Sequence, residues 1–228
     1  MEINEELAEL VGAFIGDGLI GRYGSPSKSY HVEFSGNSIY EREYYNFLSK
    51  IITRHFDVNP RFKIIGGTLR MLITYKQMYR FFRDLGFPSG IKNNIVRIPS
   101  ELYNSNMVKF VVRGIFDTDG FFFLDKRKIY EKPYPRMGFS TKSSKLFCQI
   151  NDLFLNSGYI VYTRVDKRSD IYHLEIYGTK QIRKWLSEYG IRNERKKNYA
   201  SVAQSVGIPT GVSLPDKERQ KYVTQGFR

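Results

Sequence analysis

Two aspartates, Asp17 and Asp119, stand at equivalent places in the sequence, each directly before a glycine that closes an apolar run. The runs read LVGAFIGDG from Leu10 and VRGIFDTDG from Val112. Such a run predicts a buried helix, and a closing glycine commonly lets the end of a helix enter the left-handed conformation. Free carbonyl groups make this end negative, so a carboxylate there is poorly placed unless a cation binds beside it. Two such ends brought together would form a site for a divalent cation.

Small residues recur four positions apart in both runs, as Gly12 with Gly16 and Gly114 with Thr118. Positions i and i+4 lie on one face of a helix, where small side chains let another backbone approach closely. We therefore expect these four residues to form a seam between two helices. The seam would bring both aspartates together, and their like charges would repel unless cations intervene. For either aspartate alone, the alternative is a solvent-facing residue at a helix end.

The rest of the chain repeats with nearly constant spacing. Residues 75–86 (YKQMYRFFRDLG) resemble residues 179–190 (TKQIRKWLSEYG), 104 positions further along, and Lys92 is matched by Lys196 at the same spacing. The two aspartates are 102 positions apart. Spacings that drift by a few residues are expected when hairpin loops differ in length. The sequence therefore indicates an internal duplication.

The duplication predicts two half-domains in one chain. We expect the first over residues 1–98, the second over 99–205, and a tail without a counterpart over 206–228. Hydrophobic periodicity and the Gly66-Gly67 hairpin signal predict helix, two strands, helix, two strands, helix in each half. The expected fold class is α+β, a pseudo-twofold pair of αββαββα half-domains, each with a curved, mostly antiparallel four-stranded sheet.

The composition indicates a polyanionic partner. The 228 residues can bury a full core, and they carry a formal net charge of +13. An inert basic surface is the alternative that composition alone leaves open. The single cysteine, Cys148, excludes an internal disulfide and a cysteine-rich zinc cluster and is typical of a reducing compartment. With no long apolar run and an acidic N-terminus, we expect a soluble, intracellular, free-standing protein rather than part of an intein.

Alternation along the predicted strands gives each sheet one apolar and one polar face. In residues 61–65, for example, Phe62 and Ile64 oppose two basic residues. A two-stranded ribbon fits the major groove of DNA, where polar side chains can meet base edges, although an ordinary solvated face has the same pattern. The candidate base-reading residues are His31, Glu33, Ser35, Arg61, Lys63, Arg70, Arg164, His173 and Glu175. The loop residues expected to hold phosphates are Arg22, Lys28, Lys126, Arg127, Lys128 and Arg136.

The paired runs resemble the motif of the LAGLIDADG homing endonucleases, in the single-chain form that carries two copies. The first copy keeps Leu10, Gly12, Asp17 and Gly18, and has Ile15 where the family name spells an aspartate. The second copy keeps Gly114, Asp117, Asp119 and Gly120, and has Arg113 and Thr118 in place of the two alanines. Neither departure alters the closing aspartates.

The resemblance implies that Asp17 and Asp119 bind Mg²⁺, with Mn²⁺ or Ca²⁺ able to substitute in binding. The carbonyl oxygens of Gly16 and Thr118 are further candidate ligands, because hard cations prefer oxygen. Asp117 is interpreted as a structural polar residue. The two sheets would form a saddle on a long, pseudo-symmetric double-stranded DNA site. The implied reaction is hydrolysis of one phosphodiester in each strand across the minor groove, which leaves 3′ overhangs.

Basic or polar residues are expected around the scissile phosphates. At the positions where the family carries them stand Asn37, Lys92, Lys142 and Lys196, although each lysine alone could be a surface phosphate contact. Gly36 falls where many relatives have a glutamine that organises water, so the first half shows no obvious residue for that water-organising role.

Three kinds of function remain to be weighed. The favoured one is a monomeric, intron-encoded homing endonuclease in the cytoplasm of an archaeon or in an organelle, with no membrane or protein partner. A maturase that assists RNA splicing, or a non-cleaving DNA-binding regulator of the same fold, is the alternative, and retention of both aspartates argues against a degenerate relative. A basic α/β enzyme for small phosphorylated substrates is the third, but the chain has no GxxxxGK loop.

Overall fold

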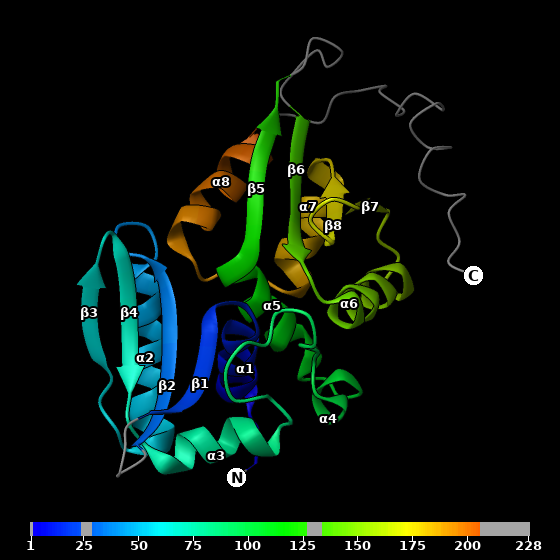
Figure 1. Ribbon diagram of the computed structural model, residues 1–228. Helices are drawn as coiled ribbons and strands as arrows, with labels where there is room; N and C mark the ends of the chain where they lie inside the picture. The colour runs from blue at the N-terminus through cyan, green and yellow to red at the C-terminus, as the bar shows by residue number, and fades with distance from the viewer. Residues whose placement is uncertain (1, 24–28, 127–133, 206–228) are drawn as a thin grey trace.

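The computed structural model describes residues 2–23, 29–126 and 134–205, and both halves share the order helix, two strands, helix, two strands, helix, to which the second half adds α4 and α8 (Figure 1). The first half consists of α1 (Glu5–Asp17), β1 (Gly18–Tyr23), β2 (Ser29–Asn37), α2 (Arg42–Phe56), β3 (Arg61–Ile65), β4 (Thr68–Ile73) and α3 (Lys76–Asp84). The second consists of α4 (Ser100–Tyr103), α5 (Val108–Asp119), β5 (Gly120–Asp125), β6 (Tyr134–Thr141), α6 (Ser144–Asn156), β7 (Val161–Asp166), β8 (Ile171–Tyr177), α7 (Thr179–Glu188) and α8 (Glu194–Ser205).

The prediction of two antiparallel sheets is confirmed. The strand orders are β1-β2-β4-β3 and β5-β6-β8-β7, and every pairing is antiparallel. The registers agree as well, because Gly18 pairs with Phe34 and Gly120 pairs with Phe139. The two helices that carry the Asp-Gly motifs, α1 and α5, therefore run directly into β1 and β5, the first strands of their sheets. This connection fixes the end of each motif helix relative to the polar face of its sheet.

Helix α8 is an element that the repeat pattern did not predict. Its equivalent in the first half, residues 90–101, forms a loop and one short turn. That loop contains Gly90 and Pro99, which disfavour a helix, whereas residues 194–205 contain neither glycine nor proline. The duplication thus preserved the position of Lys92 and Lys196 while the backbone around them diverged.

The helices bury one face of each sheet. Val32 and Phe34 in β2 are fully buried, as are Leu174 and Ile176 in β8, so the predicted alternation holds for these strands. It fails for β3, where Phe62 is 39% exposed and Ile64 is 52% exposed. Strand β3 is the outer strand of its sheet and pairs on one side only, and all five of its residues are exposed (Figure 1).

The glycines that end the motif helices have a role other than the one expected from the sequence. Gly18 has φ −83° and Gly120 has φ −71°, so both are extended rather than left-handed, and that prediction was wrong. A Cβ at Gly18 would lie 2.2 Å from the ring of Phe14, and one at Gly120 would lie 2.3 Å from the ring of Phe116. Glycine is needed here for space, because the chain turns from helix to strand over an aromatic ring.

Helices α1 and α5 lie against each other in the centre of the molecule (Figure 1). A Cβ at Gly12 would lie 2.0 Å from the carbonyl oxygen of Val111, and one at Gly114 would lie 2.3 Å from that of Glu9. The two backbones are therefore in direct contact, and any side chain at these glycines would force them apart. Among the residues that the structure describes, no helix is both long and apolar enough to cross a lipid bilayer.

Candidate metal and nucleic-acid site

The C-terminal ends of α1 and α5 meet, and they bring Asp17 and Asp119 together. A Cβ at Gly16 would lie 2.1 Å from Oγ1 of Thr118 and 3.3 Å from the carboxyl carbon of Asp119. Asp17 is half-buried, whereas Asp119 is open to solvent. The close packing at Gly12 and Gly114 fixes this arrangement, since it sets how near the two helix axes approach.

The pKa values of both carboxyl groups are raised by their surroundings. Burial raises the pKa of Asp17 from 3.8 to about 7, with further contributions from the charges of Asp119 and Glu41. Although Asp119 has surface open to solvent, crowding of its carboxyl group by the surrounding chain raises its pKa, and the ammonium groups of Lys92 and Lys196 oppose that rise. Two carboxylates that disfavour each other's charge are suited to a shared hard cation.

The donor set fits a divalent cation that completes its shell from other sources. Within the described residues, no group of three or more His, Cys, Asp and Glu side chains is arranged to hold a metal ion. Asp17 and Asp119 would therefore supply carboxylate oxygens, and water or phosphate oxygens would supply the rest. Mg²⁺ is usually bound in this way, with one or two carboxylates and several waters.

Lys92 and Lys196 hold matching positions beside the two helix ends. Nζ of Lys92 donates to the carbonyl oxygen of Gly16 at 2.9 Å, and Nζ of Lys196 donates to that of Thr118 at 2.8 Å. Both lysines are buried, with 6% and 8% of their surfaces exposed. Burial lowers the pKa of Lys92 and lowers the pKa of Lys196 to about 8. The two carbonyl groups expected as metal ligands are thus bonded to ammonium groups here.

A cavity of about 300 Å³ lies on the Asp119 side of this centre. Its walls include Gly16, Lys92, Asn93, Asp119, Ser140 and Lys142. Lys142, expected beside a scissile phosphate from its position after β6, therefore lines the same cavity as Asp119 and a lysine of the other half. The structure thus brings Lys142, Asp119 and Lys92 to the wall of one cavity.

Asn37 takes a different part in the structure. Its Oδ1 accepts hydrogen bonds from the backbone N–H groups of Ile39 and Tyr40, at 2.9 and 3.0 Å. This is the local capping that asparagine commonly provides in turns. The side chain shapes the turn between β2 and α2, and only its backbone N–H, which donates to Glu41 at 2.5 Å, reaches toward the carboxylate cluster.

Two residues near Asp17 were missed in the sequence, Glu41 and Tyr45. The hydroxyl of Tyr45 donates a 2.8 Å hydrogen bond to Oδ2 of Asp17. A Cβ at Gly36 would lie 2.3 Å from Oε2 of Glu41 and 2.7 Å from the Tyr45 hydroxyl oxygen, so these groups occupy the space that a side chain at Gly36 would fill. Their only sequence signal is a four-residue spacing at the start of a helix.

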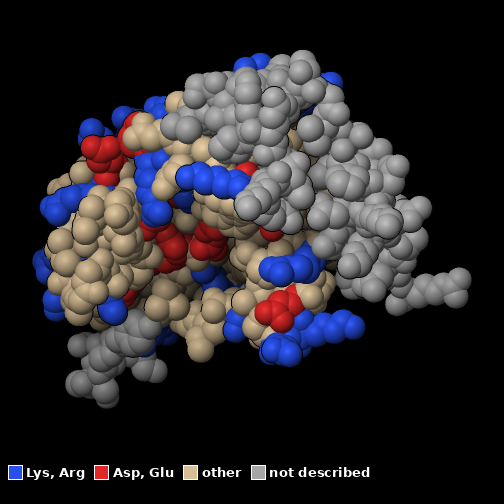
Figure 2. Space-filling view, turned by 90° about the horizontal axis from the view of Figure 1, so that it is seen from above, with Lys and Arg blue, Asp and Glu red and all other residues tan. Residues whose placement is uncertain are grey.

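The polar sheet faces carry most of the other candidates. Glu33 accepts a 2.8 Å hydrogen bond from Ser35 and pairs with Arg70 at 3.4 Å, while His173 and Ser140 lie 2.8 Å apart. His31 lies on the same face of β2 as Glu33 and Ser35. Of the basic candidates for DNA contacts, Arg22, Arg61, Lys63, Lys126 and Arg164 are exposed. Figure 2 shows lysine and arginine side chains around a hollow in which acidic atoms are visible. Lys28, Arg127 and Lys128 lie outside the described residues.

Arg22 and Arg136 were expected in loops, and this was wrong: Arg22 lies in β1 and Arg136 in β6. Arg136 is also held by neighbours. It pairs with Asp125 at 2.5 Å and with Glu175 at 3.9 Å, and its guanidinium lies 4.2 Å from the ring centre of Tyr177. A phosphate contact by Arg136 would have to compete with these partners.

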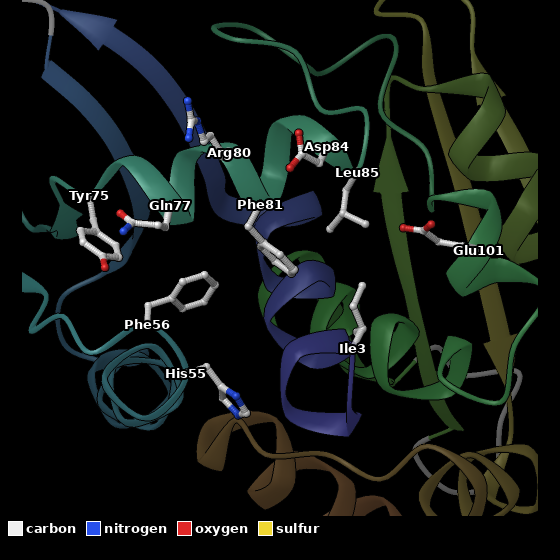
Figure 3. A pocket seen from close by; sticks show the side chains of 10 residues that line it. All are labelled: Ile3, His55, Phe56, Tyr75, Gln77, Arg80, Phe81, Asp84, Leu85 and Glu101. Carbon is white, nitrogen blue, oxygen red and sulfur yellow. The ribbon is translucent and has the colours of Figure 1, made fainter. Parts of the chain in front are cut away.

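A larger cavity, of about 570 Å³, is separate from this centre (Figure 3). It is lined by Ile3, His55, Phe56, Arg80 and Phe81 among others. Ile3 precedes α1, and Asp17 ends it, so the helix length of roughly 18 Å separates this cavity from the aspartate pair. The cavity is therefore not part of the candidate site.

Comparison with known proteins agrees with the motifs. Residues 107–190 match the family model for a LAGLIDADG-like domain. Over 227 residues, which are 97% of this chain, the sequence is 27% identical to the replication factor C small subunit of Methanocaldococcus jannaschii, of which the chain spans 11%.

Solved structures of homing endonucleases have a similar fold. The crystal structure of I-DmoI in complex with DNA and Ca aligns with a TM-score of 0.60 and 15% identity, covering 87% of this chain and 96% of that one. The structure of the meganuclease I-SmaMI bound to uncleavable DNA aligns with a TM-score of 0.58 and 11% identity, covering 84% and 86%. At these identities the likeness establishes the fold.

Proposed function

We propose that this chain, which contains a LAGLIDADG-like domain and has the fold of the homing endonucleases, is a site-specific endonuclease that cuts both strands of double-stranded DNA. The observation that carries the proposal is the meeting of Asp17 and Asp119 between two polar sheet faces, with a buried lysine at each helix end. A +13 protein of this shape is suited to a polyanion.

Asp17 and Asp119 would hold the divalent cations, for which Mg²⁺ is the proposed natural choice. When bound, the cation would supply Lewis-acid stabilisation of the attacked phosphate and lower the pKa of a coordinated water. The protein's part is to hold two carboxylates at the midline and to keep each lysine beside them. An ammonium group there would stabilise the negative charge that develops on the phosphate and on the departing oxygen.

The basic residues of the centre come from both halves of the chain. Lys92 and Lys142 line the cavity at Asp119, and the charge of Lys196 acts on both Asp17 and Asp119. We propose one cut in each DNA strand, as expected for a pseudo-symmetric target. Cleavage across the minor groove with 3′ overhangs follows from the same resemblance and belongs to the proposal.

Binding as a monomer is proposed because both half-sites lie in one chain. The solved structures of I-DmoI and I-SmaMI contain those proteins bound to DNA. In this chain, exposed Arg61, Lys63 and Arg164 on the outer strands and Arg22 on β1 would contact the duplex, with the phosphate contacts making the affinity strongly salt-dependent.

The coding sequence is proposed to lie in a mobile intron of an archaeal or organellar genome. A segment similar to this chain occurs within a much longer replication factor C small subunit, so a coding position inside a host protein is the competing arrangement. Reading the genomic sequence on both sides distinguishes the two, and the host gene joined across the element gives the target DNA.

The test uses a plasmid that carries this joined target. The protein is incubated with it in Mg²⁺, in Ca²⁺ and in EDTA, next to the Asp17→Asn and Asp119→Asn variants. We expect linear product only with Mg²⁺ and wild-type protein, and binding of the target by all three proteins in Ca²⁺. Tight, specific binding without any cut by the wild type would select a non-cleaving regulator. Binding of the unspliced RNA in preference to the DNA would select a maturase.

A further inference from the structure

Asp117 is a buried carboxylate in the second motif that the proposed chemistry does not use. It is 0% exposed and lies on α5, two residues before Asp119. We infer that Asp117 is a positioning residue, which holds the turn at residues 191–193 and thereby fixes Lys196 at the end of α5. The expected effect on DNA cleavage rests on the proposed nuclease function, whereas the hydrogen bonds that hold the turn do not.

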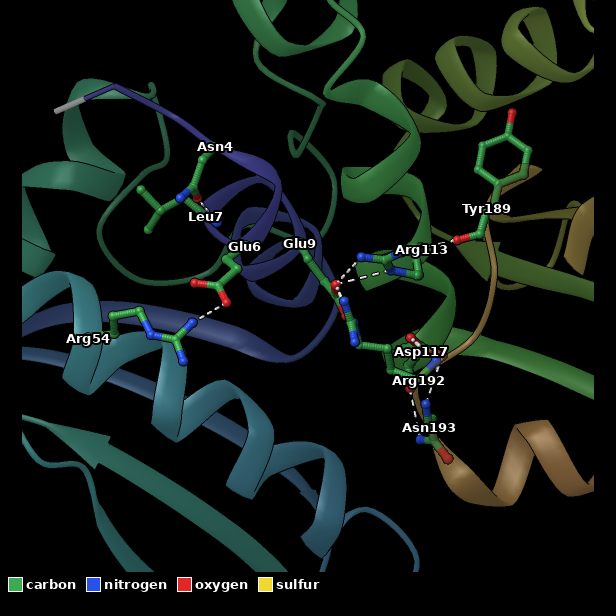
Figure 4. A network of polar contacts seen from close by, with 10 residues as sticks. All are labelled: Asn4, Glu6, Leu7, Glu9, Arg54, Arg113, Asp117, Tyr189, Arg192 and Asn193. Atoms are coloured by element: carbon green, nitrogen blue, oxygen red, sulfur yellow. Dashed lines mark hydrogen bonds and ion pairs between the residues drawn. The ribbon is translucent and has the colours of Figure 1, made fainter. Parts of the chain in front are cut away.

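The carboxylate of Asp117 binds the backbone of that turn. Its Oδ2 accepts from the N–H of Arg192 at 2.9 Å, and its Oδ1 accepts from the N–H of Asn193 at 3.3 Å. The side chain of Asn193 in turn donates to the carbonyl oxygen of Asp117 at 3.0 Å (Figure 4). Three hydrogen bonds thus join one residue of α5 to two consecutive residues of the turn.

The turn leads directly to Lys196. Oδ1 of Asn193 accepts from the backbone N–H of Lys196 at 3.4 Å, and the Asn193 carbonyl accepts from Lys197 at 2.9 Å, so Asn193 begins α8. One turn into that helix, Nζ of Lys196 donates back to the carbonyl oxygens of Phe116 and Thr118, at 2.6 and 2.8 Å. The bonds form a closed path from α5 through the turn and α8 back to α5.

The turn is also fixed to the first half of the chain. Nε of Arg192 donates to Oε2 of Glu9 at 2.8 Å, and Nε of Arg113 donates to the same oxygen at 3.0 Å (Figure 4). The guanidinium of Arg192 lies 4.5 Å from the ring centre of Phe47 in α2. Since Glu9 is fully buried, its two arginine partners offset the cost of placing its charge there.

The first half has no such carboxylate. Ile15 occupies the place of Asp117, and the turn that carries Lys92 is held by uncharged groups instead. Gly90 donates its N–H to the Ile20 carbonyl at 2.8 Å, and the Ser143 hydroxyl donates to the Val96 carbonyl at 2.6 Å. Loss of Asp117 should therefore disturb Lys196 and leave Lys92 in place.

The competing explanation is that Asp117 serves stability alone. A stabilising residue would lower the folded fraction when it is changed, and both strand cuts would then slow by the same factor. A positioning residue would slow one cut more than the other. Displacement of a catalytic group by about 1 Å can cost on the order of a hundredfold in rate.

The first experiment measures the two cuts separately, on a target with a different label in each strand. The variants are Asp117→Asn and Asp117→Ile, the second of which copies the first half. Lys196→Met identifies the strand that depends on Lys196. We expect that same strand to be cut at least about tenfold more slowly in both Asp117 variants, with the other strand within about threefold of wild type. Supercoiled plasmid should then accumulate as nicked circles.

Ile176→Ala is the matched control, because Ile176 is a buried apolar residue on β8 of the same half and is not one of the residues that bond the turn at 191–193. It should cost comparable stability and leave the ratio of the two cuts unchanged. Equal slowing of both strands in the Asp117 variants, or the same asymmetry in Ile176→Ala, would overturn the inference.

A second measurement does not require cleavage. Hydrogen exchange followed by mass spectrometry should show faster exchange in the peptide that spans residues 190–197 of Asp117→Asn, with residues 87–96 unchanged. If wild-type protein cuts no DNA while this exchange effect appears, the nuclease proposal fails and the positioning of Lys196 by Asp117 stands. Unchanged exchange at 190–197 would refute the positioning role itself.

Discussion

The ammonium group of Lys92 donates a 2.9 Å hydrogen bond to the carbonyl oxygen of Gly16, the residue directly before Asp17. Lys196 makes the equivalent bond to Thr118, the residue directly before Asp119. In both halves a lysine that follows the last repeated helix, α3 or α7, thus donates to a free carbonyl group at the end of the motif helix, α1 or α5. The bond places a positive charge where a phosphate and two carboxylates would meet.

Replacing either lysine by methionine should affect chemistry and spare binding. Methionine keeps the length and packing of the buried chain while removing the charge, so Lys92→Met should slow the cut of one strand by about a hundredfold, as loss of a charge-stabilising donor typically does. Strand-specific cleavage assays measure this effect, and filter binding in Ca²⁺ measures affinity.

Lys50→Met is the control, because Lys50 is exposed on α2. Its cleavage rates should match wild type. A uniform loss of DNA affinity in Lys92→Met, with the cleavage rate of bound DNA unchanged, would show that the lysine is an ordinary phosphate contact.

Side chains at the glycines of the helix seam should destabilise the whole molecule. In Gly12→Val the new Cβ would meet the Val111 carbonyl oxygen at 2.0 Å, which neither backbone can relieve without separating the helices. We expect the free energy of unfolding to fall by about 3 kcal/mol, a cost typical of severe overpacking. Urea unfolding measures it, and Glu43→Ala on the exposed face of α2 should change it by less than about 0.5 kcal/mol. An unchanged stability would mean that the helices are not in contact at Gly12.

Removing the Tyr45 hydroxyl should weaken the metal site on the Asp17 side. The hydrogen bond from Tyr45 opposes the rise in the pKa of Asp17, so in Tyr45→Phe that pKa rises further and less of the carboxylate is ionised near pH 7. The Mg²⁺ concentration needed for half-maximal cutting of one strand should increase by about tenfold at pH 6.5. The difference should shrink at pH 8.5, where Asp17 is ionised in both proteins. Identical Mg²⁺ dependence at pH 6.5 would contradict this role.

Without metal, the stability of the fold should decrease as the pH rises from about 5 to about 7. Asp17 keeps its proton in the folded protein up to about pH 7 but loses it near 3.8 when unfolded. Between these values the folded state binds more protons than the unfolded state, so a higher pH favours unfolding. Asp117, whose pKa burial also raises to about 7, adds to the same slope.

Urea unfolding in EDTA over this pH range measures the slope, and Asp17→Asn should reduce it. A divalent cation binds the ionised carboxylates, so Ca²⁺ should stabilise the protein much more at pH 7.5 than at pH 5. Equal stabilisation by Ca²⁺ at both pH values would argue that the ion binds elsewhere.

Sequence reasoning succeeded where a residue's role follows from its place in the repeat. The duplication placed Lys92 opposite Lys196 and predicted the order of elements, because equivalent positions in a repeat occupy equivalent places in space. It failed where neighbours come from other elements. Glu41 and Tyr45 carry no pattern that points to Asp17, and Arg136 looks like any basic residue until Asp125 and Tyr177 are seen beside it.

The amino-acid order by itself determined that two apolar helices end in Asp-Gly, that small residues line them, and that the chain is a basic duplication. These are local and periodic properties, which need no knowledge of distant contacts. Only the tertiary structure decided that the closing glycines are extended and lie over aromatic rings, that residues 194–205 form a helix, and that Asp117 binds the turn before Lys196. Each of these depends on which atoms of remote segments come within a few ångströms, and packing across the α1–α5 seam sets those distances.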